Sequence, residues 1–405
     1  MKNIFILFLA GITLLASCKK EKEKDNKVSI GSVDNLYSDI LGEERKILVY
    51  IPPSAETSLY SPQRYPVVYL LDGDSHFHAV TGMLQQLSRS AFCPEMIVVA
   101  IPNTDRSRDL TPSHSLVMPN GEEQEFLKTS GGGEHFTSFI EKELTPYIEA
   151  NYPTAPYRML IGHSFGGLFA INTLVNHPGL FNAYVAIDPS MWWDNRRLLN
   201  KIDSSVRNMN LTHKSLFISV ANTMPMNMDT LNVAKDTTTA TSHIRSILTL
   251  ARITQRYPAN GLTFGWKYYN DDNHGSVPLI SEYDALRFIF GFYRMRDNEP
   301  TTETLINHFK KVSDQIGFTM LPPEPMVNGK GYDNLQQNKF EEAYSLFAMN
   351  IENYPNSANV FDSMGDYYVA VDNKPKAMES FTKALSLKET KETRDKLDKI
   401  KADEK

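Results

Sequence analysis

The chain has 405 residues, of which 41% are hydrophobic and 22% charged, so it can bury a full core and contain more than one folded unit. The formal net charge is only -6, and lysine and arginine form no long stripe. Both features argue against a protein that binds nucleic acid electrostatically.

The amino terminus predicts a targeting segment. Residues 4–15 form an apolar run that is too short to span a bilayer and has the length of a signal-peptide core. The run ends in Leu15-Ala16-Ser17-Cys18, which resembles a bacterial lipobox with Cys18 as the lipidated residue. An ordinary signal peptide that contains a cysteine is the alternative. We expect a lipoprotein signal peptide at 1–17 and a charged tether at 18–27.

The expected lipid anchor would hold the protein at a bacterial membrane, in the cell envelope, on either the periplasmic or the surface face. The only other cysteine is Cys93. If Cys18 is acylated, no intramolecular disulfide can form, so the folded protein depends on its core for stability. We expect Cys93 to be a small core residue.

Between residues 28 and 297, short apolar runs alternate with longer helical patterns. The predicted strands are 46–51, 67–71, 96–101, 158–161, 183–187, 215–220 and 263–269. The predicted helices are 78–88, 133–151, 165–176, 241–257 and 281–293. This alternation predicts an α/β domain with a mostly parallel central sheet and helices on both faces.

The pattern changes after this domain. Residues 298–325 read as a linker with a helix, and from 326 to 405 the chain is helical with a charged tail. When this region is shifted by 34 residues, Gly331 aligns with Gly365 and Phe347 with Phe381. This spacing resembles the tetratricopeptide helix–turn–helix repeat, and a generic pair of helical hairpins is the alternative. The sequence therefore predicts a small all-α repeat domain that could bind a protein partner.

The sharpest motif is Gly162-His163-Ser164-Phe165-Gly166, which lies between a predicted strand and a predicted helix. A serine on such a strand-to-helix turn exposes its hydroxyl above the edge of the sheet. The amide end of the following helix points at the same place, so the backbone N–H of Phe165 is positioned to stabilise an oxyanion. We interpret Ser164 as a catalytic nucleophile.

Among ten histidines, His274 is the candidate base. It lies in a loop between the last predicted strand and the last helix of the domain, after the serine in chain order, as in hydrolases of this topology. The acid is uncertain. The position after strand 215–220 holds Ala221-Asn222-Thr223 and no carboxylate. We favour Asp229, with Asp188 and Asp236 as rivals. The alternative is a Ser–His dyad without an acid, in which Asn222 or a backbone carbonyl orients the imidazole ring.

Four ordered motifs carry a family resemblance: residues 65–74, the turn around Ser164, residues 188–193, and Asn273-His274-Gly275-Ser276. Together they resemble the esterase D family of α/β hydrolases, over about residues 28–295. Within this family, the loop at 71–74 and the pair Trp192-Trp193 are most similar to the enterochelin-esterase-like branch. The resemblance implies an α/β-hydrolase fold, a serine carboxylesterase activity and no cofactor or metal.

The resemblance also implies that the backbone near Asp74 supplies a second oxyanion donor. The candidate substrate-binding residues are Trp192, Trp193 and Arg108. The two tryptophans could stack on a ring of the substrate, or they could pack against the helix after Ser164. Arg108 could bind an anionic substrate, or it could belong to a salt-bridged loop.

The resulting hypothesis is that the protein hydrolyses a small-molecule carboxylic ester that is accessible in the cell envelope. A siderophore trilactone esterase is the alternative within enzymes. A catalytically inactive adaptor that binds a protein through its repeats is the alternative of another class.

Overall fold

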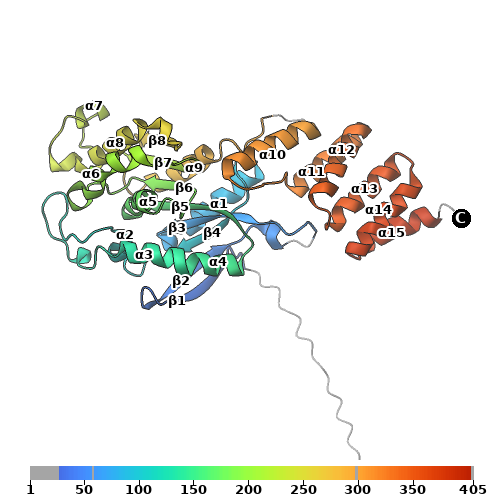
Figure 1. Cartoon of the computed structure of the whole chain (residues 1–405), viewed down its shortest axis with the longest axis horizontal. Helices are drawn as coiled ribbons and strands as arrows, with labels where there is room; N and C mark the ends of the chain where they lie inside the picture. Colours follow the sequence, from blue (N-terminus) through green and yellow to red (C-terminus); the bar gives the residue numbers. More distant parts are fainter. Residues whose placement is uncertain (1–26, 57–58, 297–299, 403–405) are drawn as a thin grey trace, which may run out of the picture.

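The structure is a computed structural model that describes residues 27–56, 59–296 and 300–402. The predicted signal peptide, the lipidation site Cys18 and nearly all of the tether lie outside these residues. An eight-stranded sheet forms the centre of the larger part of the molecule, and a row of helices extends from one side of it (Figure 1).

The strands follow the order β1-β2-β4-β3-β5-β6-β7-β8. The β1–β2 and β2–β4 pairs are antiparallel, and all other pairs are parallel. The bounds are β1 Ser32–Ser38, β2 Glu43–Tyr50, β3 Tyr65–Leu71, β4 Ile97–Ile101, β5 Thr154–His163, β6 Ala183–Ile187, β7 Ser215–Ala221 and β8 Thr263–Tyr269. Strands β3, β4 and β6 are buried along their whole length, which explains their continuous apolar sequences.

Helices cover both faces of the sheet. One face packs against α3 (Gly133–Phe139), α4 (Thr145–Asn151), α5 (Phe165–Asn176), α6 (Trp193–Asn208) and α8 (Ser242–Gln255). The other face packs against α1 (Gly73–Arg89) and α9 (Val277–Ile289). A π-helical turn at Ile140–Leu144 joins α3 to α4, and two short helices, α2 (Arg106–Leu110) and α7 (Thr230–Val233), lie in loops. These layers confirm the predicted α/β architecture.

The sequence missed two kinds of feature. Strand β1 was not predicted, because it is an edge strand whose side chains are mostly exposed and show no apolar run. Helices α1 and α9 each begin about one turn earlier than predicted. In α1 the helix starts directly after Asp72, whose left-handed backbone (φ 52°) turns the chain without a loop.

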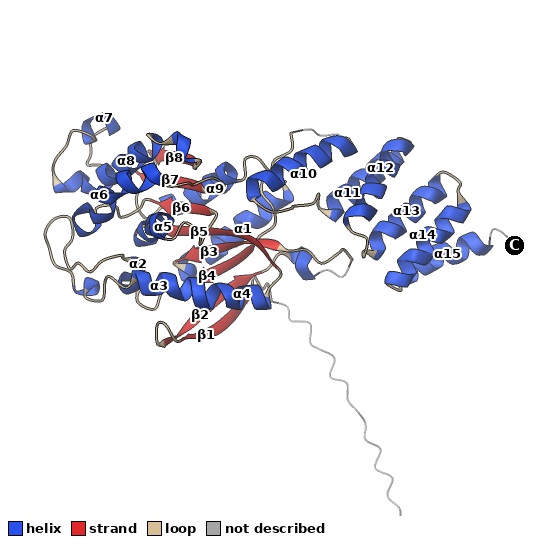
Figure 2. Ribbon diagram, viewed as in Figure 1, coloured by secondary structure: helices blue, strands red, loops and turns tan. Residues whose placement is uncertain are grey.

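Over residues 300–402, the part of this region that the structure describes, the regular elements are all helices, and Figure 2 shows no strand there. Its helices are α10 (Thr302–Ile316), α11 (Glu324–Gln336), α12 (Phe340–Asn353), α13 (Ala358–Ala370), α14 (Lys374–Leu387) and α15 (Lys391–Ala402). The two aligned copies make the same contact. A Cβ on Gly331 would lie 2.5 Å from the Phe347 ring, and one on Gly365 would lie 2.4 Å from the Phe381 ring.

The two regions are packed together. Ile316 at the end of α10 belongs to the apolar cluster on the α1/α9 face of the sheet, and the carboxylate of Glu324 accepts a 2.9 Å hydrogen bond from Ser61 N–H. A cavity of about 560 Å³ lies at this junction, bordered by Tyr65 and Ala155 at the amino ends of β3 and β5. Cys93, which also borders it, is buried as expected, and burial raises the pKa of its thiol to about 12.

Within the described part of the chain, none of the helices is both long enough and apolar enough to cross a bilayer.

Candidate active site

Four polar residues follow the carboxyl ends of parallel strands. Asp72 follows β3, Ser164 follows β5, Asp188 follows β6, and His274 lies in the loop after β8. Because parallel strands end at the same edge of a sheet, these residues meet there, opposite the edge that borders the cavity. The structure therefore brings Ser164 and His274 together, as the sequence predicts.

Ser164 occupies a strained turn between β5 and α5. Its φ and ψ are 59° and −111°, a conformation that non-glycine residues rarely adopt. The turn is tight, because a Cβ on Gly162 would lie 2.3 Å from the carbonyl oxygen of Gly166. The hydroxyl oxygen of Ser164 lies 3.1 Å from His274 Nε2 and 3.2 Å from the hydroxyl oxygen of Ser190. The side chain is thus held toward an imidazole.

The loop that carries His274 is rigidified by its own hydrogen bonds. The side-chain oxygen of Asn273 accepts from the N–H groups of Gly275 and Ser276. The side chain of Asn222, after β7, donates to the carbonyl of Asn270 in the same loop at 2.9 Å. Asn222 therefore fastens the backbone of this loop and does not orient the imidazole ring directly.

The carboxylate at His274 is that of Asp188, so the prediction that favoured Asp229 is corrected. Asp188 Oδ2 lies 2.6 Å from His274 Nδ1. Asp229 is the amino-terminal cap of α7, where its side chain accepts from the N–H groups of Leu231 and Asn232. The other rival, Asp236, accepts from the hydroxyls of Thr238 and Thr241. Both carboxylates are engaged in local capping and turn contacts.

A second histidine contacts the same carboxylate. His243 Nε2 lies 2.8 Å from Asp188 Oδ2, and Asp188 Oδ1 accepts 2.9 Å from Ala221 N–H. Within the described residues, Asp188, His243 and His274 are the one group of potential metal ligands, with ligand atoms within 4.8 Å of one another. Since both imidazoles reach the same oxygen, the arrangement is that of two N–H donors on one carboxylate.

His163 lies beside His274, and His76 lies beside His163 in turn. The His163 ring is 4.5 Å from the His274 ring, and His76 pairs with the buried carboxylate of Glu282 at 2.7 Å. Burial, followed by electrostatic repulsion from the neighbouring His274, lowers the pKa of His163 to about 4. His163 is therefore a neutral ring at neutral pH and adds no positive charge next to His274.

The loop after β3 is tied to the turn at Ser164 by one arginine. Arg106 makes a bidentate ion pair with Asp72, at 2.6 and 3.0 Å, and donates to the carbonyl of His163 at 3.1 Å. Burial alone would raise the pKa of Asp72, but the pairing with Arg106 and Asn103 holds the pKa below its ordinary value. Because β3 and β5 pair in parallel register, Asp74 in the first turn of α1 lies beside the turn at Ser164.

The backbone N–H groups of Asp74 and Phe165 both belong to first helical turns, where no carbonyl of the same helix accepts them. Both therefore remain candidates for stabilising negative charge near Ser164.

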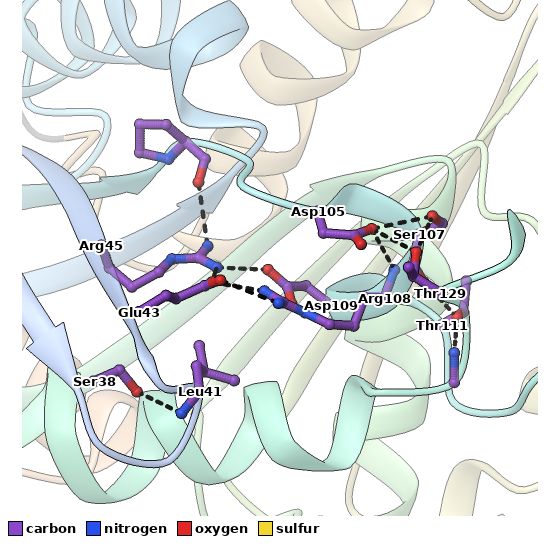
Figure 3. A network of polar contacts seen from close by, with 12 residues as sticks. Ser38, Leu41, Glu43, Arg45, Asp105, Ser107, Arg108, Asp109, Thr111 and Thr129 are labelled. Carbon is purple, nitrogen blue, oxygen red and sulfur yellow. Dashed lines mark hydrogen bonds and ion pairs between the residues drawn. The ribbon is translucent and has the colours of Figure 1, made fainter. Parts of the chain in front are cut away.

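Arg108, proposed as a substrate-binding residue, belongs instead to a structural network (Figure 3). It pairs with Glu43 at 2.6 Å and with Asp109 at 2.8 Å, and Asp109 pairs with the buried guanidinium of Arg45 at 2.6 Å. Figure 3 shows this network joining strand β2 to helix α2. Because α2 also carries Arg106, the network fixes the helix that holds the Asp72 loop.

The two tryptophans have different environments. Trp193 is buried, donates from its indole N–H to the carbonyl of Ser113 at 3.1 Å, and packs edge-on against Phe165. It is a core residue that packs against the helix after Ser164, as one of its two predicted roles has it, and it is not available to stack on a substrate. Trp192 is partly exposed, with its ring 6.1 Å from that of Phe165, and remains the candidate for a substrate contact.

Sequence reasoning missed His243 altogether. It lies in the first turn of α8, outside every motif, and nothing in the sequence separates it from the other histidines. Asp188 had a signal: it is a carboxylate directly after a wholly apolar strand, at the edge where the nucleophile turn also lies.

Comparison with known proteins agrees with this geometry. Residues 38–261 match the sequence profile of the family described as Putative esterase. The ferri-bacillibactin esterase BesA of Bacillus subtilis (strain 168) is 36% identical over 157 residues, which cover 36% of this chain and 54% of that protein. The siderophore enterobactin esterase of Emericella nidulans is 33% identical over 150 residues, 33% of this chain and 49% of that protein.

Among solved structures, an IroE-like serine hydrolase from Shewanella oneidensis superposes with a TM-score of 0.70 and 31% identity, covering 80% of this chain and 99% of that one. The chain spans about half the length of the curated relatives it matches. The profile covers more than half of this chain and includes Ser164 and Asp188, and the solved relative covers 80% of the chain. The chain belongs to the Putative esterase family.

Proposed function

We propose that this protein is a serine carboxylic ester hydrolase. The observation that carries the proposal is the continuous contact from Ser164 Oγ to His274 Nε2, and from His274 Nδ1 to Asp188, at 3.1 and 2.6 Å. A nucleophile, a base and an orienting carboxylate in this order form the arrangement that activates a serine for acyl transfer. The esterase relatives support the proposal.

In the proposed reaction, Ser164 attacks the ester carbonyl while His274 accepts its proton at Nε2. The N–H groups of Phe165 and Asp74 hold the oxyanion, and the ionised carboxylate of Asp188 stabilises the imidazolium. His274 then protonates the leaving alcohol, and an acyl group remains on Ser164. Water attacks this acyl-enzyme with His274 as base, which releases the acid and restores the serine.

The test replaces Ser164 by alanine. Ser164→Ala is expected to lower the hydrolysis of a p-nitrophenyl ester to the level of a protein-free control, and to abolish labelling by a fluorophosphonate probe. The alanine removes one partly buried hydroxyl, so the unfolding midpoint should stay nearly unchanged. Retained turnover in a folded Ser164→Ala protein would show that another residue is the nucleophile.

A siderophore ester is the favoured physiological substrate. Two curated relatives with more than 30% identity are described as a ferri-bacillibactin esterase and an enterobactin esterase. Ser164-dependent cleavage of a ferric catecholate trilactone would support this substrate class. Cleavage of only a feruloyl or acetyl sugar ester would place the enzyme in glycan breakdown.

The location in the cell envelope rests on the lipobox-like Leu15-Ala16-Ser17-Cys18. We propose that Cys18 is lipidated and anchors the protein to a bacterial membrane. Metabolic labelling with an alkyne fatty acid should mark the wild-type protein and leave Cys18→Ala unlabelled. Equal labelling of both proteins would refute the anchor.

The helical region is proposed to consist of tetratricopeptide-like repeats that bind a protein partner. The equivalent contacts of Gly331 with Phe347 and of Gly365 with Phe381 support the repeat assignment. The alternative of an inactive adaptor predicts that the folded wild-type protein is not labelled by a fluorophosphonate probe. The intact contact between Ser164 and His274 argues against that alternative.

A further inference from the structure

His243 reaches the proposed catalytic centre from an element that carries no other member of it. It is the second residue of α8, and its Nε2 lies 2.8 Å from Asp188 Oδ2. The His243 and His274 rings are nearly perpendicular, at 88°, with centroids 5.1 Å apart. The two imidazoles therefore approach one carboxylate oxygen from different directions.

The position of Asp188 explains why such a contact is needed. Hydrolases of this topology usually carry the acid after the strand that here is β7, whereas Asp188 follows β6. Its backbone is left-handed, with φ 40°, and the side chain extends to the end of β7, where Ala221 N–H donates to Oδ1. Oδ1 is thus fixed by β7, and Oδ2 is fixed by His243 together with His274.

The protonation states follow from the contacts. Asp188 is fully buried, and a buried carboxylate requires donors to remain ionised. Burial would raise the pKa of Asp188, but the hydrogen bond from His243, followed by that from His274, outweighs burial and holds the pKa far below its ordinary value. Each imidazole can donate one N–H to Oδ2, and in a neutral His274 a proton on Nδ1 makes Nε2 the acceptor that faces Ser164.

From these contacts we infer that His243 is a positioning residue for the proposed hydrolysis, so that the site is a Ser164–His274–Asp188–His243 array. The hydrogen bond of His243 to the site is to Asp188, so His243 acts through that carboxylate. Its hydrogen bond to Oδ2, together with that of Ala221 N–H to Oδ1, holds the carboxylate in its orientation when His274 becomes an imidazolium. The inference rests on the proposed function and adds a fourth member to its machinery.

The test compares two replacements of His243. Gln places an amide N–H near the position of Nε2, whereas Phe keeps the ring volume and has no donor. His243→Phe should lower kcat for a p-nitrophenyl ester by about 10- to 100-fold and leave KM within about twofold, because binding is not touched. His243→Gln should recover kcat to within about fivefold of the wild-type value.

A matched control is His76→Phe. It removes another histidine from a buried carboxylate, that of Glu282, but leaves Asp188 unchanged. Its unfolding midpoint should fall about as much as that of His243→Phe, while its kcat stays within about twofold of the wild type. An equal loss of kcat in both variants would assign His243 a role in stability only and overturn the inference.

The rate of labelling of Ser164 by a fluorophosphonate probe separates this inference from the proposed function. It should fall in His243→Phe in parallel with kcat, whatever the physiological ester is. A wild-type protein that neither hydrolyses esters nor becomes labelled would refute the proposed function and the inference with it. A labelled wild type with an equally fast, folded His243→Phe would refute the inference alone.

Discussion

His163 shows how a single residue next to Ser164 links the site to stability. Its ring lies between the rings of His274 and His76, at centroid distances of 4.5 and 6.3 Å. Its Nε2 is buried without a hydrogen-bond partner. A proton on this nitrogen would be a buried charge beside another imidazole, which is why the folded protein resists protonation of His163.

We therefore predict an acid-sensitive stability that depends on His163. The unfolded chain binds the proton near the ordinary pKa of 6.5, whereas the folded chain binds it only near 4. Above pH 6.5 the protonation of His163 does not lower the free energy of unfolding. As the pH falls to 4, the free energy of unfolding decreases by up to about 3 kcal/mol, because the unfolded state then binds more protons than the folded state. Urea unfolding at pH 7 and pH 4.5 should show a smaller difference for His163→Gln than for the wild type. An identical difference in both proteins would contradict this prediction.

At the scale of elements, the repeats depend on a close approach of paired helices. Gly331 in α11 faces the Phe347 ring of α12, and a Cβ there would lie at 2.5 Å, closer than real contacts allow. The same helix contains Gly329, around which an added Cβ would meet nothing within 4 Å. The two glycines of one helix therefore form a matched pair.

We predict opposite effects of alanine at the two positions. Gly331→Ala should destabilise the protein by about 1–3 kcal/mol, because Phe347 must move out of its packed position. Gly329→Ala should stabilise it by up to about 1 kcal/mol through helix propensity. Chemical unfolding measures both changes. A destabilising Gly329→Ala, or a neutral Gly331→Ala, would mean that α11 and α12 do not pack as described.

The sequence predicts those strands, helices and turns whose signal lies in a short run of neighbouring residues. The buried strands β3, β4 and β6 appear in the sequence as continuous apolar runs, and the turn at Ser164 has a motif of its own. The sequence named Asp188 as a rival acid but favoured Asp229, because the choice depends on tertiary geometry. Whether a carboxylate after β6 or one in the long loop after β7 reaches His274 is decided by the path of the chain through space. His243 was missed for the same reason.

At the scale of the whole molecule, the helical region contributes to the core of the α/β region. Ile316 lies in the apolar cluster beneath α1 and α9, and Tyr293 at the end of that region packs against Phe309 of α10. The carboxylate of Glu324 is fully buried and bridges Ser61 to Ser357. These contacts all lie away from the sheet edge that carries Ser164.

We predict that removal of residues 297–405 lowers the thermal stability of the protein but leaves its rate of ester hydrolysis nearly unchanged. The truncated protein should unfold at a temperature several degrees lower, because the apolar surface around Ile316 becomes exposed. Well below that temperature it should hydrolyse a small ester at a rate within about twofold of the full chain. Calorimetry and kinetics on both proteins give the two readouts. Loss of turnover in a truncated protein that is still folded would show that the helices help to build the site.

The left-handed backbones of Asp72, Ser164 and Asp188 follow three of the strands in the middle of the sheet, and each costs conformational energy. The backbones of Ser164 and Asp188 aim their side chains at His274, and that of Asp72 aims its carboxylate at Arg106, which also binds the carbonyl of His163. At Ser164, selection for hydrolysis therefore works against selection for stability. In a gene copy that no longer needs to hydrolyse esters, selection would no longer remove glycine or asparagine at position 164. Descendants that lost the activity should therefore become more thermally stable through changes at Ser164, while Asp72 and Asp188 persist because Arg106 and Ala221 N–H need their carboxylates.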